Sequence, residues 1–176
     1  LKSGATRYTA NAGLLRLRES ICAYMDRRFG LEYDPRSQVF VTVGGSEGID
    51  AVIRSLVNPG DEVLIPQPSF VCYAPLTELA GGVPVILPTY EQDQFRLRPD
   101  VLKQAITPKT KLLIMPYPNN PTGAVMTMTD YQAIADVLKQ TDVVVLADEI
   151  YAELTYTGQP PVSFAQADGM YERTVI

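Results

Sequence analysis

The sequence predicts an α/β fold, namely a three-layer α/β/α domain with a mainly parallel sheet. Short apolar runs alternate with segments of helical periodicity along most of the chain, which is typical of a parallel sheet covered on both faces. The run Val143–Leu146 is apolar without interruption, as expected for a strand that is buried on both faces. A length of 176 residues is enough for one domain with its own core.

The first half of the chain opens with an amphipathic helix. Apolar side chains recur at steps of three and four over residues 13–29, and Gly30 closes the helix. The run Val39–Val43 predicts a strand, and the glycines after it lead into a helix over 47–57. The rest of this half is expected to form a strand over 63–65, a helix over 70–80 and a strand over 83–87.

The second half continues the same alternation. Pro99 occupies the first turn of a short helix that ends at Ile106. A longer helix is expected over 129–139, where Thr129 and Gln132 have the spacing of a capping box. Strands are expected over 112–115, over 143–146 and from Thr174 onward.

Composition and charge exclude several classes of partner. The net charge is −5, and acidic and basic residues are mixed along the chain, so no basic face is available for nucleic acid. No apolar run approaches the roughly 20 residues of a membrane span. We therefore expect neither a nucleic acid nor a membrane as partner.

The residue types present also limit the chemistry. The chain contains no histidine, which excludes Ser-His-Asp and Cys-His hydrolysis and most zinc sites, and no metal site is expected. Cys22 and Cys72 are expected to be reduced thiols of a cytoplasmic protein rather than a bridge or a catalytic pair. If the protein is an enzyme, its chemistry is expected to come from an organic cofactor.

Two polar segments, Pro118–Gly123 and Val145–Tyr151, each follow an apolar strand. Asn120 and Asp148 are 28 residues apart, close to the roughly 30 residues of a strand–helix–strand unit. Their side chains are therefore expected at neighbouring strand ends, where open α/β sheets bind ligands. A protonated ring nitrogen would pair with Asp148, which is costly to bury alone. A metal ligand or helix cap is the alternative for Asp148, and a simple turn is the alternative for Asn120.

A glycine-rich turn, Gly44–Glu47, lies between a predicted strand and a predicted helix. Free backbone N–H groups and the positive end of the helix suit a phosphate group there, and Ser46 can cap the helix and donate to an anion. The turn matches neither the Walker pattern nor the dinucleotide fingerprint. An ordinary turn at the start of a helix is the alternative.

Two aromatic residues are further candidates. Phe70 is expected at the start of a helix beside a strand end, where its ring could stack on a flat ligand or simply belong to the core. Tyr8 precedes the first helix and is either a surface or interface residue or part of a site.

Four motifs together resemble the pyridoxal-phosphate-dependent aminotransferases of fold type I, and in particular the class I/II family of aspartate and aromatic aminotransferases. The resemblance covers nearly the whole chain, and the context of Asn120 resembles bacterial aromatic or N-acetyl-diaminopimelate aminotransferases. The motifs stand in the family's order, at residues 8–18, 44–47, 120–123 and 148–151.

The resemblance implies pyridoxal 5′-phosphate as cofactor and a role for each ring contact. By this resemblance, Asp148 pairs with the pyridinium nitrogen, and Asn120 and Tyr151 bind the 3-oxygen of the ring. Phe70 stands where the family stacks an aromatic side chain on the ring. Asp148 and Tyr151 are the expected catalytic residues.

The same resemblance implies a phosphate site and a subunit arrangement. Gly45, Ser46 and Glu47 correspond to the helix start that holds the cofactor phosphate. Tyr8 corresponds to a tyrosine that reaches the phosphate of the other subunit, which implies a homodimer. The expected substrates are an amino acid and a 2-oxo acid, between which an amino group moves.

The sequence departs from the family because no lysine stands in the Ser-x-x-Lys context of the residue that carries the cofactor. Residues 1–176 are therefore expected to be a partial large domain, without the small domain, the N-terminal arm and the lysine-bearing segment, and inactive alone. A carbon–sulfur lyase of the same fold and a non-catalytic sensor domain of a transcription regulator are the alternatives. The lysines present are Lys2, Lys103, Lys109, Lys111 and Lys139.

Overall fold

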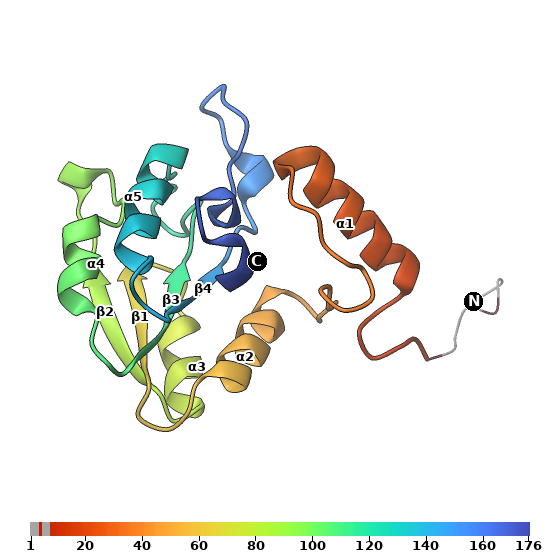
Figure 1. The fold of residues 1–176 in the computed structure, drawn as a ribbon, viewed down its shortest axis with the longest axis horizontal. Coiled ribbons are helices and arrows are strands. Elements are labelled where there is room, and N and C mark those ends of the chain that lie inside the picture. The colour runs from red at the N-terminus through yellow and green to blue at the C-terminus, as the bar shows by residue number, and fades with distance from the viewer. Residues whose placement is uncertain (1–3, 5–7) are drawn as a thin grey trace. The chain divides into compact units, whose positions relative to one another are not determined.

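The computed structural model describes residues 4 and 8–176, and the chain divides into two compact units, Leu1–Gly44 and Gly45–Ile176. The ribbon is drawn in Figure 1. No helix in the described part of the chain is long and apolar enough to cross a membrane.

The first unit contains one helix, α1 (Leu15–Phe29), within its described residues. Gly30 has a φ of 65°, and its N–H donates to the carbonyl of Asp26 over 2.8 Å. Only glycine adopts this left-handed conformation without steric cost, so it ends the helix as the sequence predicts. The guanidinium of Arg18, which is 8% exposed, donates to the carbonyl of Pro35 over 2.8 Å.

The predicted strand Val39–Val43 is wrong. The N–H of Val41 donates to the carbonyl of Ala12 over 3.1 Å, but these residues pair with no strand among the described residues of this unit. Phe40 and Val43 are both exposed. A β-branched run becomes a strand only when a neighbouring strand accepts and donates its backbone hydrogen bonds, and here none does.

The second unit holds a five-stranded sheet in which every neighbouring pair is parallel, in the order β2-β1-β3-β4-β5. This confirms the predicted parallel sheet. The strands are β1 (Glu62–Gln67), β2 (Val83–Pro88), β3 (Thr110–Met115), β4 (Val144–Ala147) and β5 (Thr174–Val175).

Helices cover both faces of this sheet, as Figure 1 shows for α2 and α3 on one side and α4 and α5 on the other. Alternate residues of β1 separate the two cores: Leu64 packs with α4 and α5, whereas Val63 and Ile65 pack with α2 and α3. The three-layer arrangement is therefore the predicted one. The helices are α2 (Gly45–Leu56), α3 (Tyr73–Leu79), α4 (Pro99–Ala105) and α5 (Met128–Leu138), with short 3₁₀ turns η1 (Glu91–Asp93), η2 (Ala152–Leu154), η3 (Phe164–Gln166) and η4 (Tyr171–Arg173).

Two details of the helices differ from expectation. The capping box of α5 is formed by Thr127 and Asp130, not by Thr129 and Gln132, because the helix already begins at Met128. Thr127 Oγ1 accepts a bond from the Asp130 N–H over 3.2 Å, and Asp130 Oδ2 accepts one from the Thr127 N–H over 2.8 Å. Helix α3 begins three residues after Phe70, so Phe70 belongs to the preceding loop.

Candidate functional site

A pocket of about 170 Å³ lies in the second unit, at the carboxyl ends of β1, β3 and β4. The chain runs from β1 outward to β2 and then returns to β3 on the other side of β1, so the strand order reverses between β1 and β3. Open α/β sheets bind ligands at such a reversal. The lining residues are Gly45, Ser46, Ile49, Phe70, Tyr73, Pro116, Pro118, Asn120, Asp148, Ile150 and Tyr151.

The start of α2 forms one wall of the pocket through Gly45 and Ser46. The first N–H groups of a helix have no acceptor within it, and this end of a helix attracts anions. A Cβ built on Gly45 would meet nothing within 4 Å, so the space above this backbone is open. Glu47 lies in the same helical turn but does not line the pocket.

Asp148, at the end of β4, is bound by a residue that sequence reasoning missed. The phenol of Tyr73 donates a hydrogen bond to Asp148 Oδ2 over 2.6 Å. Burial and the nearby carboxylate raise the pKa of Tyr73 far above its usual range, so the phenol stays protonated. In the helix predicted over 70–80, Tyr73 would share a face with Phe70, and that spacing was the signal that could have identified it.

Glu149, the next residue, is directed elsewhere, as the alternation along a strand predicts. Its Oε1 accepts bonds from Ser163 Oγ and from the N–H of Phe164, each over 2.9 Å. Burial raises the pKa of Glu149 to about 7, against the two hydrogen bonds that lower it. Glu149 therefore supports the fold and does not line the pocket.

In the turn after β3, the consecutive residues Asn119 and Asn120 have different surroundings. Asn119 Oδ1 accepts bonds from the N–H of Thr122 over 3.2 Å and from Thr122 Oγ1 over 2.8 Å, and its carbonyl accepts the N–H of Gly123 over 2.9 Å. Asn119 thus stabilises the turn, while Asn120 lines the pocket. The Asn120 amide makes no hydrogen bond to any residue that the structure describes, so it is available to a ligand.

Aromatic side chains complete the pocket. The ring of Phe70 meets that of Tyr73 edge to face, with centroids 6.0 Å apart and an interplanar angle of 82°. Tyr151 lines the pocket and is 37% exposed. Tyr8 belongs to the first unit, where its side chain is fully exposed.

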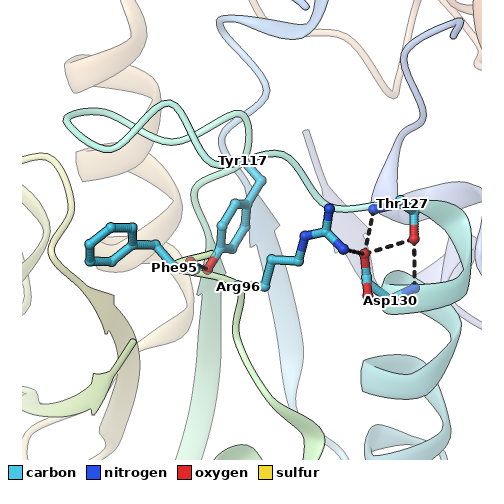
Figure 2. A network of polar contacts seen from close by, with 5 residues as sticks. All are labelled: Phe95, Arg96, Tyr117, Thr127 and Asp130. Carbon is cyan, nitrogen blue, oxygen red and sulfur yellow. Dashed lines mark hydrogen bonds and ion pairs between the residues drawn. The ribbon is translucent and has the colours of Figure 1, made fainter. Parts of the chain in front are cut away.

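A polar network includes Tyr117 (Figure 2), in the loop after β3 that also carries the pocket residues Pro116 and Pro118. Tyr117 lies between these two prolines and is buried, and its phenol donates to the carbonyl of Phe95 over 3.0 Å. The next residue, Arg96, forms an ion pair with Asp130 over 3.2 Å. Tyr117 thus anchors this loop to the segment around Phe95, while its two neighbours line the pocket.

The structure therefore brings Gly45, Ser46, Phe70, Asn120, Asp148 and Tyr151 to one pocket. Asp148 is the only charged residue among those that line it, and none of them is a lysine. No group of three or more acidic or cysteine side chains in the described part of the chain could hold a metal ion. The lining thus combines the start of a helix, an end that favours anions, with one carboxylate and aromatic side chains.

Known proteins are similar to this chain in sequence and in fold. The family model for aminotransferase class I and II matches residues 1–175. The chain is 45% identical to aromatic-amino-acid aminotransferase 2 of Thermococcus litoralis and 43% identical to an aspartate aminotransferase of Pyrococcus abyssi, over 99% of its length in both cases. It covers 45% of each of these relatives.

Solved structures agree. The aromatic aminotransferase of Pyrococcus horikoshii superposes with a TM-score of 0.95 at 44% identity, over 98% of this chain and 46% of that one. The chain thus spans less than half the length of the relatives it matches. It belongs to the class I and II aminotransferases, a family that depends on pyridoxal phosphate.

Proposed function

We propose that the whole protein containing this chain moves an amino group from an amino acid to a 2-oxo acid, and that the pocket around Asp148 holds its pyridoxal 5′-phosphate. One observation carries this proposal. The Asp148 carboxylate lines the pocket, is bound by a neutral phenol, and has no cationic partner among the described residues. An anion of this kind is stabilised by a cation on the ligand, and a protonated ring nitrogen is such a cation.

The lining residues and the open space at Gly45 support this placement of the cofactor. We assign the phosphate to the start of α2, where Gly45 and Ser46 line the pocket and Glu47 completes the first turn. The open space above Gly45 leaves room for a group that approaches the backbone closely. The phosphate would bring the negative charge that a helix start favours.

We assign the ring to the other end of the pocket. Phe70 is 37% exposed and offers its ring as a stacking surface. The Asn120 amide and the Tyr151 phenol, both on the lining, are the donors for the 3-oxygen of the ring. Asp148 would keep a proton on the ring nitrogen, which makes Asp148 and Tyr151 the catalytic residues of this chain.

When bound, pyridoxal phosphate would supply an electron sink for negative charge at the substrate α-carbon. The chain's own residues bind and orient it and hold the proton at the ring nitrogen. The lysine that carries the cofactor in this family is not among the lining residues, so we propose that another part of the whole protein contributes it. In that view the chain is a partial large domain.

The remaining assignments also rest on the family. Tyr8 is proposed to reach the phosphate of a second subunit in a homodimer, and its exposed side chain is compatible with such a contact. A cytoplasmic location is proposed because Cys22 and Cys72 are both free thiols. The relatives named above act on aromatic amino acids or aspartate according to their names, so the proposal is limited to an amino acid and a 2-oxo acid.

The test is an amino-transfer assay on the whole protein, in which a panel of amino acids is offered with a 2-oxo acid and the products are identified by mass spectrometry. We expect one new amino acid and one new 2-oxo acid in equal amounts. Asp148→Ala should lower the rate by about a hundredfold or more, whereas Asp168→Ala, at an exposed surface position, should not. Release of ammonia and pyruvate without a new amino acid would identify a lyase and contradict the proposal.

A further inference from the structure

Tyr73 connects two parts of the pocket that are 75 residues apart in the chain. It is the first residue of α3, and its phenol reaches Asp148, which directly follows β4. Only 2% of its surface is exposed. A bond of 2.6 Å from a hydroxyl to a carboxylate is in the range of strong, charge-assisted hydrogen bonds.

The two oxygens of Asp148 are not equivalent. Oδ2 accepts the short bond from Tyr73, whereas Oδ1 accepts, from the described residues, only a long hydrogen bond of 3.4 Å from the N–H of Ile150. We propose that Tyr73 is a positioning residue that fixes Asp148 with Oδ1 free for the ring nitrogen of the cofactor, and that it thereby sets how strongly the site selects a protonated ring nitrogen. This inference rests on the proposed function and adds a determinant to it.

A neutral donor suits this task better than a cation would. A lysine or arginine on Asp148 would neutralise its charge and compete with the ring nitrogen for it. Tyr73 supplies a hydrogen bond without neutralising the charge of the Asp148 carboxylate. Its phenol stays neutral because burial and the carboxylate raise its pKa far above neutrality. Asp148 can therefore be held in place and still act as the anion of the pocket.

The other titratable groups near this pair do not supply a cation either. Cys72 precedes Tyr73, and burial followed by the Asp148 charge raises the pKa of its thiol to about 11. Tyr151 interacts electrostatically with Tyr73, and Glu149 interacts with Asp148 while its own bonds go to η3. Among the described residues, Tyr73 is thus the side chain that holds Asp148.

Tyr73 also supports the stacking surface, since its ring meets Phe70 edge to face at 6.0 Å. Phenylalanine at position 73 would keep this ring contact and remove only the hydroxyl. Tyr73→Phe therefore separates the hydrogen bond from the packing, and it is the informative substitution.

The experiment compares two ligands by isothermal titration calorimetry on the whole protein containing this chain, after its bound cofactor has been removed. One is pyridoxal 5′-phosphate, and the other is its deaza analogue, in which carbon replaces the ring nitrogen. The unaltered chain should prefer the ligand with the nitrogen. Tyr73→Phe should weaken binding of pyridoxal phosphate by about tenfold, the value of a hydrogen bond to a charged group, and should leave binding of the analogue unchanged.

Two control variants test whether the loss of affinity in Tyr73→Phe acts through Asp148. Tyr131→Phe removes the same atom from a tyrosine that is buried in the core on the other face of the sheet, and it should change neither affinity. In an Asp148→Ala background, Tyr73→Phe should cause no further loss, because the residue acts through Asp148. Circular dichroism of each variant verifies its fold.

The outcomes separate this inference from the function on which it rests. Equal losses for both ligands, or no loss for pyridoxal phosphate, in a chain that otherwise prefers the ring nitrogen would overturn the role of Tyr73 alone. Equal affinity of the unaltered chain for both ligands, or no binding of either, would overturn the proposed placement of the cofactor, and the inference with it.

Discussion

Asp148 and Glu149 are consecutive residues whose carboxylates enter different environments. Asp148 accepts the phenol of Tyr73 and lines the pocket, whereas Glu149 accepts Ser163 Oγ and the N–H of Phe164. Tyr73 and Phe164 belong to the two different hydrophobic cores. The two consecutive carboxylates after β4 thus reach different surroundings: Asp148 faces the pocket, and Glu149 is bound within the fold.

Titration of the buried Glu149 carboxyl should make the stability of the protein depend on pH. Its pKa is raised from an unfolded value of 4.5 to about 7, chiefly by burial. Because the folded protein favours the protonated form, this contribution is fully present below pH 4.5 and is lost as the pH rises through about 7. Glu149→Gln should reduce the loss of unfolding free energy between pH 5 and pH 8, by no more than about 3 kcal/mol.

Urea unfolding at the two pH values measures this difference. Glu172→Gln, at an exposed position in η4, serves as the matched control and should leave the pH dependence as it is. If Glu149→Gln and Glu172→Gln have the same pH profile as the unaltered chain, the buried carboxylate is not the group that titrates.

Asp130 should contribute more to the free energy of unfolding than an ordinary surface carboxylate does. It caps α5 together with Thr127 and pairs with Arg96, the residue after the carbonyl that Tyr117 binds (Figure 2). Asp130→Ala should lower the unfolding free energy by about 1 to 2 kcal/mol, the usual value of a helix cap, measured in urea.

Asp136 provides the comparison on the same helix. Its carboxylate meets Lys139 over 2.8 Å, but its side chain is 59% exposed, and solvent screens such pairs. Asp136→Ala should therefore have little effect. An equal loss in both variants would mean that the capping box and the Arg96 pair contribute nothing beyond a surface charge.

Gly82 should not tolerate a side chain. A Cβ at this position would lie 2.6 Å from Val57 Cγ1 and 3.2 Å from the carbonyl of Asp61. Gly82→Ala should lower the unfolding free energy by about 1 to 3 kcal/mol, as overpacking usually does. A variant as stable as the unaltered chain in urea would show that α2 and β1 have room to move apart there.

Gly45→Ala, unlike Gly82→Ala, should leave stability intact and should weaken the binding of the ligand. The added Cβ would meet nothing within 4 Å, and alanine favours a helix over glycine by up to about 1 kcal/mol, so stability should be unchanged or slightly higher. Binding of pyridoxal phosphate should weaken by about tenfold, because the methyl group occupies the space assigned to the phosphate. Unchanged affinity in a calorimetric titration would place the phosphate away from Gly45.

The sequence predicted the sheet well, because the central strands β1, β3 and β4 are largely buried and their apolar runs are unambiguous. The segment Val39–Val43 has the same composition but forms no strand, since the described residues of its unit offer it no neighbouring strand. Whether such a run forms a strand depends on a neighbouring strand as much as on its own residues.

The pocket was also largely predictable, since strand ends of a parallel sheet meet at one edge and carry Asn120 and Asp148 there. Tyr73 was missed because its role depends on a contact across 75 residues. The sequence pointed to Asn120, which does line the pocket, but the turn-stabilising role of Asn119 became visible only from its hydrogen bonds.

The most direct test of the central proposal is a crystal structure of the whole protein with pyridoxal 5′-phosphate. We predict the ring nitrogen within hydrogen-bonding distance of Asp148 Oδ1, the ring against Phe70, and the phosphate at the start of α2 beside Gly45 and Ser46. A cofactor bound elsewhere, or one in this pocket with its ring nitrogen turned away from Asp148, would contradict the account.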